Sequence, residues 1–540
     1  MRSEPVPAAS ALPDSRGLNL YTADSGFDPL LRLYLGHELH AHLRPHFERL
    51  GALAGSELDE LALTADKNPP QLRSRTRAGA DQQSIEKHPA YRRLEEVAFS
   101  EYGLAAMSHR GGVLGWPQPL PPIAKYALSY LYVQAEFGAC CPLSMTDALA
   151  RTLSRFGDAA LVARYLPGLT SQDMDTLTQG AMFMTEQGAG SDVGATATRA
   201  VRDEEGWRLY GDKWFCSNAD AGVALVLARP DGAATGTKGL SLFLLPRTLA
   251  DGSPNRYRIV RLKDKLGTRD MASGEIRLEG ALAYPVGDPQ RGFVQMADMI
   301  NLSRLSNGMR AAGLMRRALT EALFWARNRI AFDKRLIEMP LMQRQLLKLM
   351  LPTEAARSVM LYTASQLAAA DGGDEAARRR VRLLTPLLKF RACRDARRVT
   401  GDAMEVRGGC GYIEEWSDAR LLRDAHLGSI WEGTSNIVAL DALRAIRKDE
   451  SLIPLLDGLR GTPFDDHLNK AARFASEADA AHARQAATTL YYATAAAILW
   501  QEGERLPRRR QLAGLVREYR LEPHDPFQRT GPPRPDLLDE

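Results

Sequence analysis

The sequence has few cysteines, and their spacing argues against two kinds of structural site. There are five in 540 residues, and none of them shows the CxxC spacing of a zinc ligand pair. We therefore expect neither a zinc site nor a disulfide framework, and such thiols suit a reducing compartment. The cysteines are Cys140, Cys141, Cys216, Cys393 and Cys410.

Long apolar runs and a strong net charge are also missing. No stretch approaches the roughly 20 apolar residues of a membrane span, and the first residues hold no apolar run of the length that a signal peptide needs. We therefore expect a cytoplasmic protein without a membrane segment. The formal net charge is only +4, which over this length does not by itself indicate nucleic acid as a partner.

A group of four histidines near the N-terminus lacks the order of a known metal motif. The HExxH arrangement is absent, and on a helix these side chains would not share one face. We expect no metal here. The group consists of His37, His40, His42 and His46.

The apolar periodicity changes twice along the chain, from helical to β and back to helical. A chain of 540 residues is too long for a single core, so several domains are expected. Residues 68–83, which are polar and contain Pro69 and Pro70, are predicted to form a loop. The expected division is an arm and helical domain over 1–178, a β-domain over 179–290, a helical bundle over 291–440 and an additional helical region over 441–540.

Seven short β-type runs in the middle of the chain predict a small antiparallel β-domain of roughly 100 residues. Turn-forming and charged residues separate them, as at 203–206 and 230–232. The fold class is therefore α+β and mainly α. The runs are residues 182–184, 207–210, 213–217, 223–228, 240–245, 257–260 and 275–278.

Glu432 is an isolated carboxylate in an apolar stretch, residues 427–437 (LGSIWEGTSNI). Gly433 allows a turn that would present this side chain to a ligand. A carboxylate in apolar surroundings gains basicity, which suits a general base that removes a proton from carbon. The alternative is an ordinary helix N-terminus, with Thr434 or Ser435 as the cap and Glu432 solvated.

Two segments of the β-region have the composition of a ligand-binding surface. Residues 184–193 (MTEQGAGSDV) follow a predicted strand, and their glycines and hydroxyls could approach a phosphate or a ring. No helical pattern follows, so this is not the dinucleotide fingerprint. On the strand of residues 211–218, Phe215 could cover a ring that Ser217 hydrogen-bonds, although aromatic residues in the core of a sheet would look the same.

Five ordered motifs resemble the acyl-CoA dehydrogenase family. They are MTEQGAGSDV at 184–193, GDKWFCSN at 211–218, KDKLGTR at 263–269, RIAFD at 329–333, and RGGCGY at 407–412 leading into IWEGTS at 430–435. The resemblance covers roughly residues 125–445 and implies a helical N-terminal domain, a β-domain and a four-helix C-terminal domain, with FAD between the last two. The long N-terminal region and the added C-terminal helices are most similar to the AidB (alkylation-response) branch.

The resemblance also implies a role for individual residues. Glu432 corresponds to the catalytic base; some members carry that base on an earlier helix, but the matching position here is Ser303. Ser191, Ser303 and Arg304 would contact the substrate, and Arg329 and Phe332 would reach an FAD in a neighbouring subunit. The residues implied for cofactor binding are Met184, Thr185, Gly190, Ser191, Phe215, Cys216, Ser217, Arg329, Phe332, Gly408, Gly409, Trp431, Gly433, Thr434 and Asn436.

Three positions depart from the family pattern. Asp333 replaces the usual glycine after Phe332, Glu405 stands where many members have glutamine, and so does Pro340. A negative charge at Glu405 would lie near the FAD phosphates. These departures leave FAD as the expected cofactor and predict a site with low turnover.

The function implied is α,β-dehydrogenation of an acyl-CoA thioester by an FAD enzyme. Glu432 would remove the α-proton while hydride leaves for flavin N5. Subunits that complete one another's sites imply a homo-oligomer, a dimer of dimers or homotetramer. An electron-transfer flavoprotein is a further partner that the resemblance implies.

The alternative is a flavin-containing protein that binds double-stranded DNA in the alkylation-damage response, with little dehydrogenase activity. Residues 441–540 hold 15 basic and 16 acidic side chains, so this region is not basic overall. Within it, a basic run could contact phosphates, although a solvated helix face is the simpler explanation. A second basic run lies at 378–398. The first run comprises Arg505, Arg508, Arg509, Arg510, Arg517 and Arg520.

Overall fold

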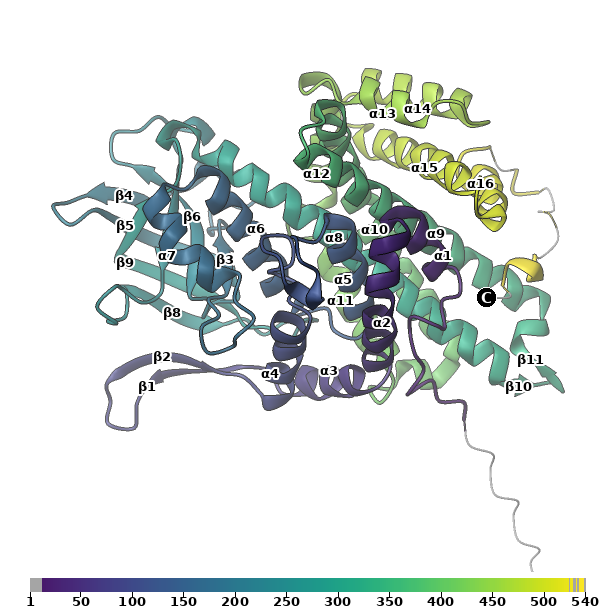
Figure 1. Ribbon diagram of the computed structural model, residues 1–540, viewed down its shortest axis with the longest axis horizontal. Coiled ribbons are helices and arrows are strands. Elements are labelled where there is room, and N and C mark those ends of the chain that lie inside the picture. Colours follow the sequence, from purple (N-terminus) through teal and green to yellow (C-terminus); the bar gives the residue numbers. More distant parts are fainter. Residues whose placement is uncertain (1–11, 524, 528–530, 532–533, 539–540) are drawn as a thin grey trace, which may run out of the picture.

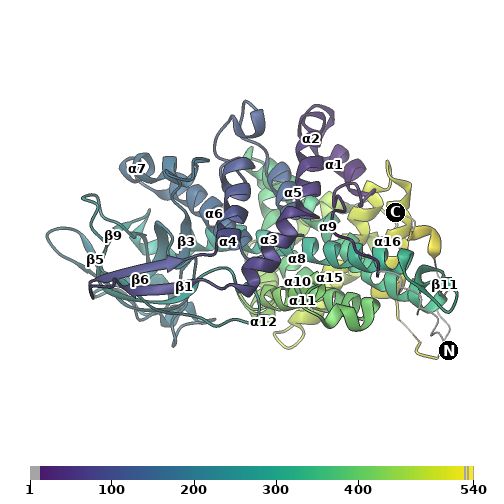
Figure 2. The same ribbon diagram turned by 90° about the horizontal axis from the view of Figure 1, so that it is seen from below.

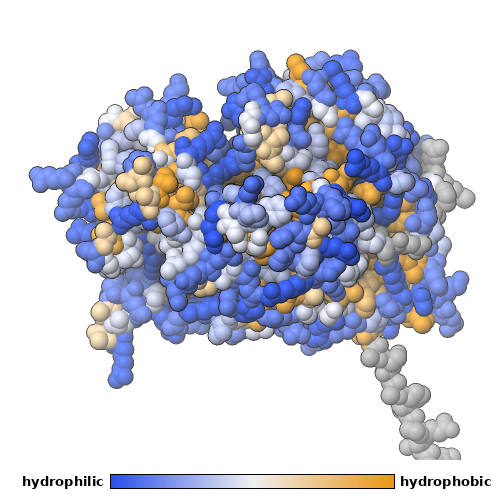
Figure 3. All heavy atoms as spheres, viewed as in Figure 1, coloured by the Kyte–Doolittle hydropathy of each residue, from blue (hydrophilic) through white to orange (hydrophobic). Residues whose placement is uncertain are grey.

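A sheet and a large body of helices lie side by side, joined by one long helix (Figure 1). The computed structural model describes residues 12–523, 525–527, 531 and 534–538. Residues 1–11 of the N-terminal arm, which is predicted over residues 1–25, therefore lie outside the described residues. In the part of the chain that is described, no helix is long and apolar enough to cross a membrane. The face shown in Figure 3 is mainly hydrophilic, with apolar side chains gathered in small separate patches.

The N-terminal part is helical, as the periodicity predicts. Its helices pack through buried aromatic and aliphatic side chains, among them Phe27 and Phe47, whose rings meet edge to face. His40 contacts Asp28, and His42 contacts the carbonyl of Leu114. The helices are α1 Phe27–Leu35, α2 His37–Ala54, α3 Glu57–Lys67, α4 Pro89–Glu96, α5 Pro122–Tyr132, α6 Cys140–Phe156 and α7 Ala159–Leu169.

The loop prediction for residues 68–83 is wrong, because this segment belongs to a β-hairpin. Strands β1 Gln71–Arg75 and β2 Asp81–Glu86 pair antiparallel and project from the helices toward the sheet (Figures 1 and 2). The Gln83 side chain accepts a hydrogen bond from the Ile259 amide at 2.9 Å, which ties the hairpin to strand β8 Tyr257–Leu262. Apart from the cross-strand pair Leu72 and Ile85, the side chains of the hairpin are polar and mostly exposed, so its sequence lacks the alternation that marks a half-buried strand.

The β-domain contains every predicted run and one strand more. Strand β5 Trp207–Ser217 joins two of the predicted runs, and β4 Arg199–Arg202 is the addition. The sheet is mixed, since β3–β6 and β4–β6 pair parallel, while the other pairs are antiparallel as expected. The remaining strands are β3 Gly180–Phe183, β6 Val223–Pro230, β7 Ser241–Pro246 and β9 Ser273–Pro285.

The central helix α8 Gly292–Asn328 begins beside the sheet and crosses the whole helical body (Figure 1). It packs closely on α10 Glu375–Arg407, because a Cβ at Gly308 would lie only 2.5 Å from Leu388 Cγ. Helix α9 Pro340–Asp371 begins with Pro340 in its first turn, where proline is tolerated. The bundle is completed by α11 Ser417–Gly428 and α12 Ser435–Lys448.

The C-terminal helices cover one side of this bundle and are anchored by a buried arginine. Arg509 on α16 is 3% exposed and makes ion pairs with Glu354 on α9 and Glu502 on α15. This burial argues against the predicted phosphate contact of Arg509. The four helices are α13 Leu452–Leu459, α14 Asp465–Glu477, α15 Ala483–Glu502 and α16 Pro507–Arg520.

Candidate functional site

Glu432 lies in a tight turn between α11 and α12 whose backbone is left-handed at two successive residues. The φ angle is 55° at Glu432 and 98° at Gly433. A non-glycine residue in this region is strained, and such strain gathers at functional sites. Thr434 occupies the N-cap position of α12 without a side-chain cap hydrogen bond. The alternative, an ordinary helix start, is therefore right that Thr434 is the N-cap residue of α12. It does not explain the left-handed backbone at Glu432 and Gly433.

Two cations hold this turn through its carbonyl groups. The Arg304 guanidinium donates to the Glu432 carbonyl at 2.9 Å, and Lys389 Nζ donates to the Gly433 carbonyl at 2.5 Å. Arg304 is itself fixed by Asp441 at 2.6 Å. Because Arg304 comes from α8 and Lys389 from α10, the bundle determines where the Glu432 side chain points.

The pKa of the Glu432 carboxyl is raised above its ordinary value because burial disfavours the charged form. The Ser303 hydroxyl and the cations Arg304, Arg310 and Lys389 act in the opposite direction and favour the carboxylate. The side chain is therefore a stronger base than a solvated glutamate and is still able to ionise. This combination suits a general base.

Trp431 is held in a stack beside the carboxylate. Its ring packs on Phe137 with centroids 5.9 Å apart, and the Arg310 guanidinium lies 4.7 Å from the Trp431 ring centroid. Trp431 Nε1 is buried and has no hydrogen-bond acceptor among the described residues. A buried N–H without a partner is uncommon and indicates a group that a ligand satisfies.

The end of strand β5 reaches the same region. Ser217 hydrogen-bonds the thiol of Cys141; burial raises the pKa of that thiol, the charge of Arg310 lowers it and the charge of Glu432 raises it. Phe215 is 58% exposed, so it is not a core aromatic residue of the sheet. Cys216, in contrast, is completely buried, which argues against a contact between its side chain and a cofactor.

The loop that follows β3 is anchored by a buried ion pair. Lys213 Nζ on β5 contacts the Glu186 carboxylate at 2.7 Å, and the same carboxylate accepts a hydrogen bond from the Ala197 amide at 2.7 Å. Gly188 and Gly190 have open space where a Cβ would lie. Neither glycine has a positive φ, so the backbone conformation does not require glycine at either position. The open space fits an approaching ligand.

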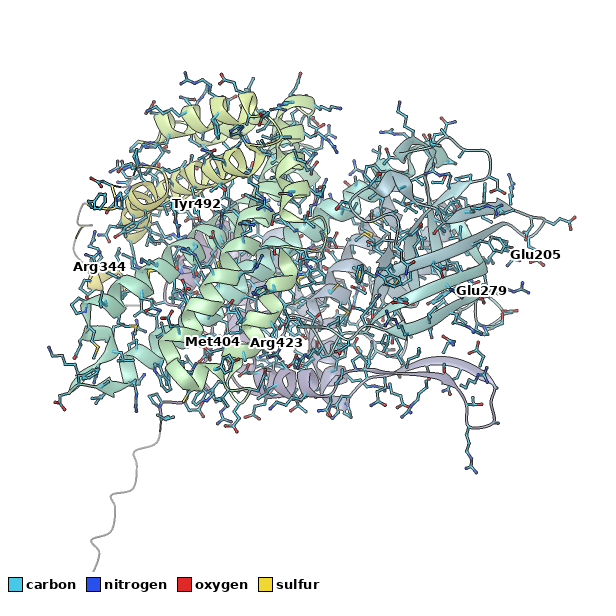
Figure 4. All side chains as sticks on the ribbon, turned by 180° about the vertical axis from the view of Figure 1, so that it is seen from behind. Glu205, Glu279, Arg344, Met404, Arg423 and Tyr492 are labelled. Carbon is cyan, nitrogen blue, oxygen red and sulfur yellow. The ribbon has the colours of Figure 1, made fainter. Side chains whose placement is uncertain are left out.

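Four of the residues implied for cofactor binding lie at the other end of the helical bundle. Arg329 and Phe332 follow the last residue of α8, about 37 Å along the helix axis from Ser303. Phe332 is 90% exposed, and Gly408 and Gly409 follow the C-terminal end of α10 nearby. In Figure 4, Met404, near the C-terminal end of α10, lies far from Glu279 on the sheet. One chain therefore does not bring the two groups together.

The local backbone explains one departure at this distal group. Asp333 has a φ of 58°, in the left-handed region that glycine occupies freely and aspartate tolerates. It lies in the turn between β10 Ile330–Ala331 and β11 Lys334–Arg335, so the turn survives the replacement. Glu405 is exposed on α10.

Several residues around Glu432 have no signal in the sequence. Phe137, Arg310 and Lys389 belong to no motif, and each looks like an ordinary position of a helical pattern. The basic composition of α10 is plain from the sequence, but nothing in it distinguishes Lys389, which is 1% exposed, from the surface arginines beside it. Only the packing of α8 against α10 identifies Arg310 and Lys389, and only its stack on Trp431 identifies Phe137.

Three family models match consecutive parts of the chain. "Adaptive response protein AidB N-terminal domain" matches residues 12–176, and "Acyl-CoA dehydrogenase, middle domain" matches residues 181–281. "Acyl-CoA dehydrogenase, C-terminal domain" matches residues 290–446. The three matches follow the order of helical, β and helical parts in the structure.

Individual relatives extend this similarity over most of the chain. "Acyl-CoA dehydrogenase family member 11" from Caenorhabditis elegans is 31% identical over 81% of this chain and 72% of that protein. "Putative acyl-CoA dehydrogenase AidB" from Escherichia coli is 34% identical over 75% of this chain and 74% of that protein. The crystal structure of Caenorhabditis elegans ACDH-11 in complex with C11-CoA superposes with a TM-score of 0.85 at 26% identity, covering 96% and 93% of the two chains.

Proposed function

Because the chain belongs to the acyl-CoA dehydrogenase family and has an N-terminal domain of the AidB type, we propose that it dehydrogenates an acyl-CoA thioester with Glu432 as the base. The members of this family are oxidoreductases that act on the CH–CH group of acyl-CoA. The observation that carries the proposal is the raised pKa of Glu432 in a turn that Arg304 and Lys389 hold in place.

FAD is the cofactor that this proposal requires, since the family is FAD-dependent. The residues present fit a flavin. Phe215 is exposed beside Ser217, Gly188 and Gly190 leave open space, and Trp431 Nε1 lacks an acceptor among the described residues. We propose that these groups hold the ring and its side chain together with Met184, Thr185, Ser191, Gly433, Thr434 and Asn436. Bound FAD would supply the acceptor for the hydride that leaves the β-carbon.

The protein's own part in the reaction is to hold and move a proton. Glu432 would accept the α-proton of the thioester on a carboxylate oxygen. The Ser303 hydroxyl and Arg304 lie beside that carboxylate and would orient the bound acyl group. Burial of the site excludes water and strengthens these interactions. The ligand of ACDH-11, C11-CoA, supports an acyl-CoA as the substrate class.

We propose a homo-oligomer, a dimer of dimers, in which one subunit completes the cofactor site of another. Arg329, Phe332, Gly408 and Gly409 lie too far from Ser217 to act in the same site of one chain. An exposed Phe332 is well suited to contact a second subunit. The electron acceptor proposed is an electron-transfer flavoprotein, and the compartment proposed is the cytoplasm.

Measurement of flavin content and of mass in solution tests this proposal. Purified protein should show a flavin spectrum, release one FAD per chain on denaturation and sediment as an oligomer. Arg329→Ala combined with Phe332→Ala should lower FAD content while leaving the helical content unchanged. Colourless protein that also fails to take up added FAD would contradict the proposed function, and a flavin-saturated monomer would contradict the shared site.

Double-stranded DNA is the second candidate ligand, and the exposure of the arginines supports the second predicted basic run, at 378–398, more than the first. In the first basic run, Arg505 and Arg510 are exposed, Arg508 contacts the Leu537 carbonyl, and Arg517 pairs with Glu522. Arg520 lies over the Tyr492 ring. The run is thus only partly available to phosphates.

A tighter group of cations lies on α10 and α15. The pKa of Arg394 is lowered by burial and by the charges of Arg391, Arg484 and Arg397. Arg397, Arg398 and Arg484 are exposed. Replacing these three by alanine should weaken duplex binding and reduce its salt dependence, by roughly one unit of log–log slope for each phosphate that is no longer neutralised. An unchanged slope would contradict DNA binding through this surface.

A further inference from the structure

Two buried polar side chains on α8 lack the partners that such groups normally have. Arg310 is 1% exposed, and its Nη1 atom has no hydrogen-bond acceptor among the described residues. Asn307, also 1% exposed, has no described partner for either its amide nitrogen or its amide oxygen. Buried polar groups are almost always satisfied, and a buried charge without a counter-ion is unfavourable. Both side chains therefore require an explanation.

These side chains share one face of α8 with Ser303, since residues separated by three, four and seven positions lie on the same side of a helix. The Arg310 side chain turns back along the helix, because its Nε lies 3.4 Å from the Ser306 carbonyl. The guanidinium thus lies about one helical turn, roughly 5 Å, beyond Ser303. The Ser303 hydroxyl hydrogen-bonds the Glu432 carboxylate, so Asn307 and Arg310 lie just beyond the reacting centre.

Positive charge around this face exceeds negative charge. Arg310 contacts the rings of Trp431 and Phe137, and a cation over an aromatic ring is only partly compensated. Lys389 is also buried. Burial raises the pKa of the Cys393 thiol, and the charges of Lys389 and Arg310 lower it. The Cys393 thiol contacts the Asn307 carbonyl at 3.6 Å. Neither Arg310 nor Lys389 has a carboxylate partner in the described part of the chain. Glu432 is the acid that faces them, and it must remain available as the base.

We propose that Asn307 and Arg310 bind a carboxylate at the far end of the substrate's acyl group. A planar guanidinium matches a carboxylate in shape, and the Asn307 amide would donate a further hydrogen bond. The proposal rests on the proposed dehydrogenation and names its substrate class, a thioester of a short dicarboxylic acid. Because the guanidinium lies only about one helical turn beyond Ser303, only a few bonds can separate the reacting carbons from the distal carboxylate, so the diacid must be short.

Binding of two thioesters that differ only at the distal end tests this proposal. The probes are glutaryl-CoA, which ends in a carboxylate, and pentanoyl-CoA, which has the same number of acyl carbons and ends in a methyl group. Affinities are measured by titration calorimetry on FAD-loaded protein that carries Glu432→Gln, so that binding is observed without proton removal. We expect glutaryl-CoA to bind about 10- to 100-fold more tightly, the range of a hydrogen bond to a charged group.

Variants at the two residues separate recognition from folding. Arg310→Met keeps an unbranched side chain without the charge and should abolish or reverse the preference for glutaryl-CoA, whereas Arg310→Lys keeps the charge and should retain part of it. Asn307→Leu should reduce the preference without disturbing the stack of Arg310 on Trp431, and FAD content and melting temperature report whether each variant is folded. Equal or weaker binding of glutaryl-CoA by the parent protein would overturn this inference alone. Failure to bind either thioester would overturn the proposed function with it.

Discussion

Lys389 donates a hydrogen bond to the carbonyl of Gly433 from the neighbouring helix, and burial lowers its pKa to about 8. The same ammonium group lowers the pKa of Glu432, the residue before that glycine. A single side chain therefore fixes the backbone of the turn and adjusts the basicity of the carboxylate that the turn presents. This coupling makes the pH dependence of the reaction sensitive to a residue that does not contact the acyl group.

Lys389→Met should shift the pH profile of flavin reduction to higher pH. Glu432 acts when ionised, so the rate rises with pH through its folded-state pKa and is lost below it. Burial already raises that pKa, and removing a cation that lowers it raises it further. The rate of flavin bleaching by acyl-CoA, measured anaerobically between pH 5 and 9, checks this. Lys348→Met, at an exposed position of α9, should leave the profile unchanged; a shift toward lower pH in Lys389→Met would contradict the coupling.

The ion pair between Glu186 and Lys213 should be required for the geometry of the loop that follows β3. Glu186→Ala leaves the buried Lys213 ammonium without its counter-ion, which typically costs about 3–5 kcal/mol. The double variant Glu186→Leu with Lys213→Met removes both charges and should recover part of that loss. Denaturant unfolding compares the two variants, and FAD content should fall in both because the Ala197 amide loses its acceptor. A double variant less stable than Glu186→Ala would contradict this account.

Arg509 should stabilise the fold rather than bind DNA. It is buried between Glu354 and Glu502, so Arg509→Ala removes an ion-pair partner from two buried carboxylates and should lower the free energy of unfolding by about 3–5 kcal/mol. Arg505→Ala, at an exposed position just before α16, should change stability by no more than about 0.5 kcal/mol. Thermal unfolding of the two variants side by side checks this. Similar melting temperatures would show that the buried pairs contribute little.

Arg509 is buried and Arg505 is exposed, a difference that the sequence does not predict. In the sequence they belong to one basic run, and only the packing of α16 on α9 makes one of them a core residue. The same applies to Arg310, because no local pattern records whether a guanidinium has a counter-ion. The sequence predicts a loop where β1 and β2 form a hairpin, since each strand has only one apolar residue, Leu72 or Ile85, and a single apolar residue gives no periodic signal.

The features that the sequence predicts correctly are those that depend on neighbours in the chain. The family resemblance and the α+β fold are confirmed, and each predicted β-type run lies within or overlaps a strand. Glu432 can be singled out because an isolated acid next to a glycine, with apolar residues on both sides, predicts a carboxylate in a buried turn. The resemblance also predicts that Arg329 and Phe332 act away from their own chain's Glu432, and their contact with another subunit stays a prediction.

Glu432→Gln separates a dehydrogenase from a protein that keeps flavin for another purpose. Glutamine preserves the shape of the side chain but cannot accept a proton from carbon, and the hold of Arg304 and Lys389 on the backbone carbonyls is untouched. Wild-type protein mixed anaerobically with a panel of acyl-CoAs should lose its flavin absorbance with at least one of them. The variant should bind the same thioester and bleach about 10²–10⁴-fold more slowly, the usual contribution of a positioned base.

The outcomes of that experiment point to different functions. FAD content of the Gln variant should equal that of wild type, because Glu432 is proposed to face the substrate and not to hold the cofactor. Equal bleaching rates in both proteins would remove Glu432 from the role of base. Absence of bleaching with every acyl-CoA, in protein that carries FAD, would favour the DNA-binding alternative. The exposed Glu405 and the Asp333 turn alter the surface proposed for the neighbouring cofactor, so we expect bleaching that is measurable but slow.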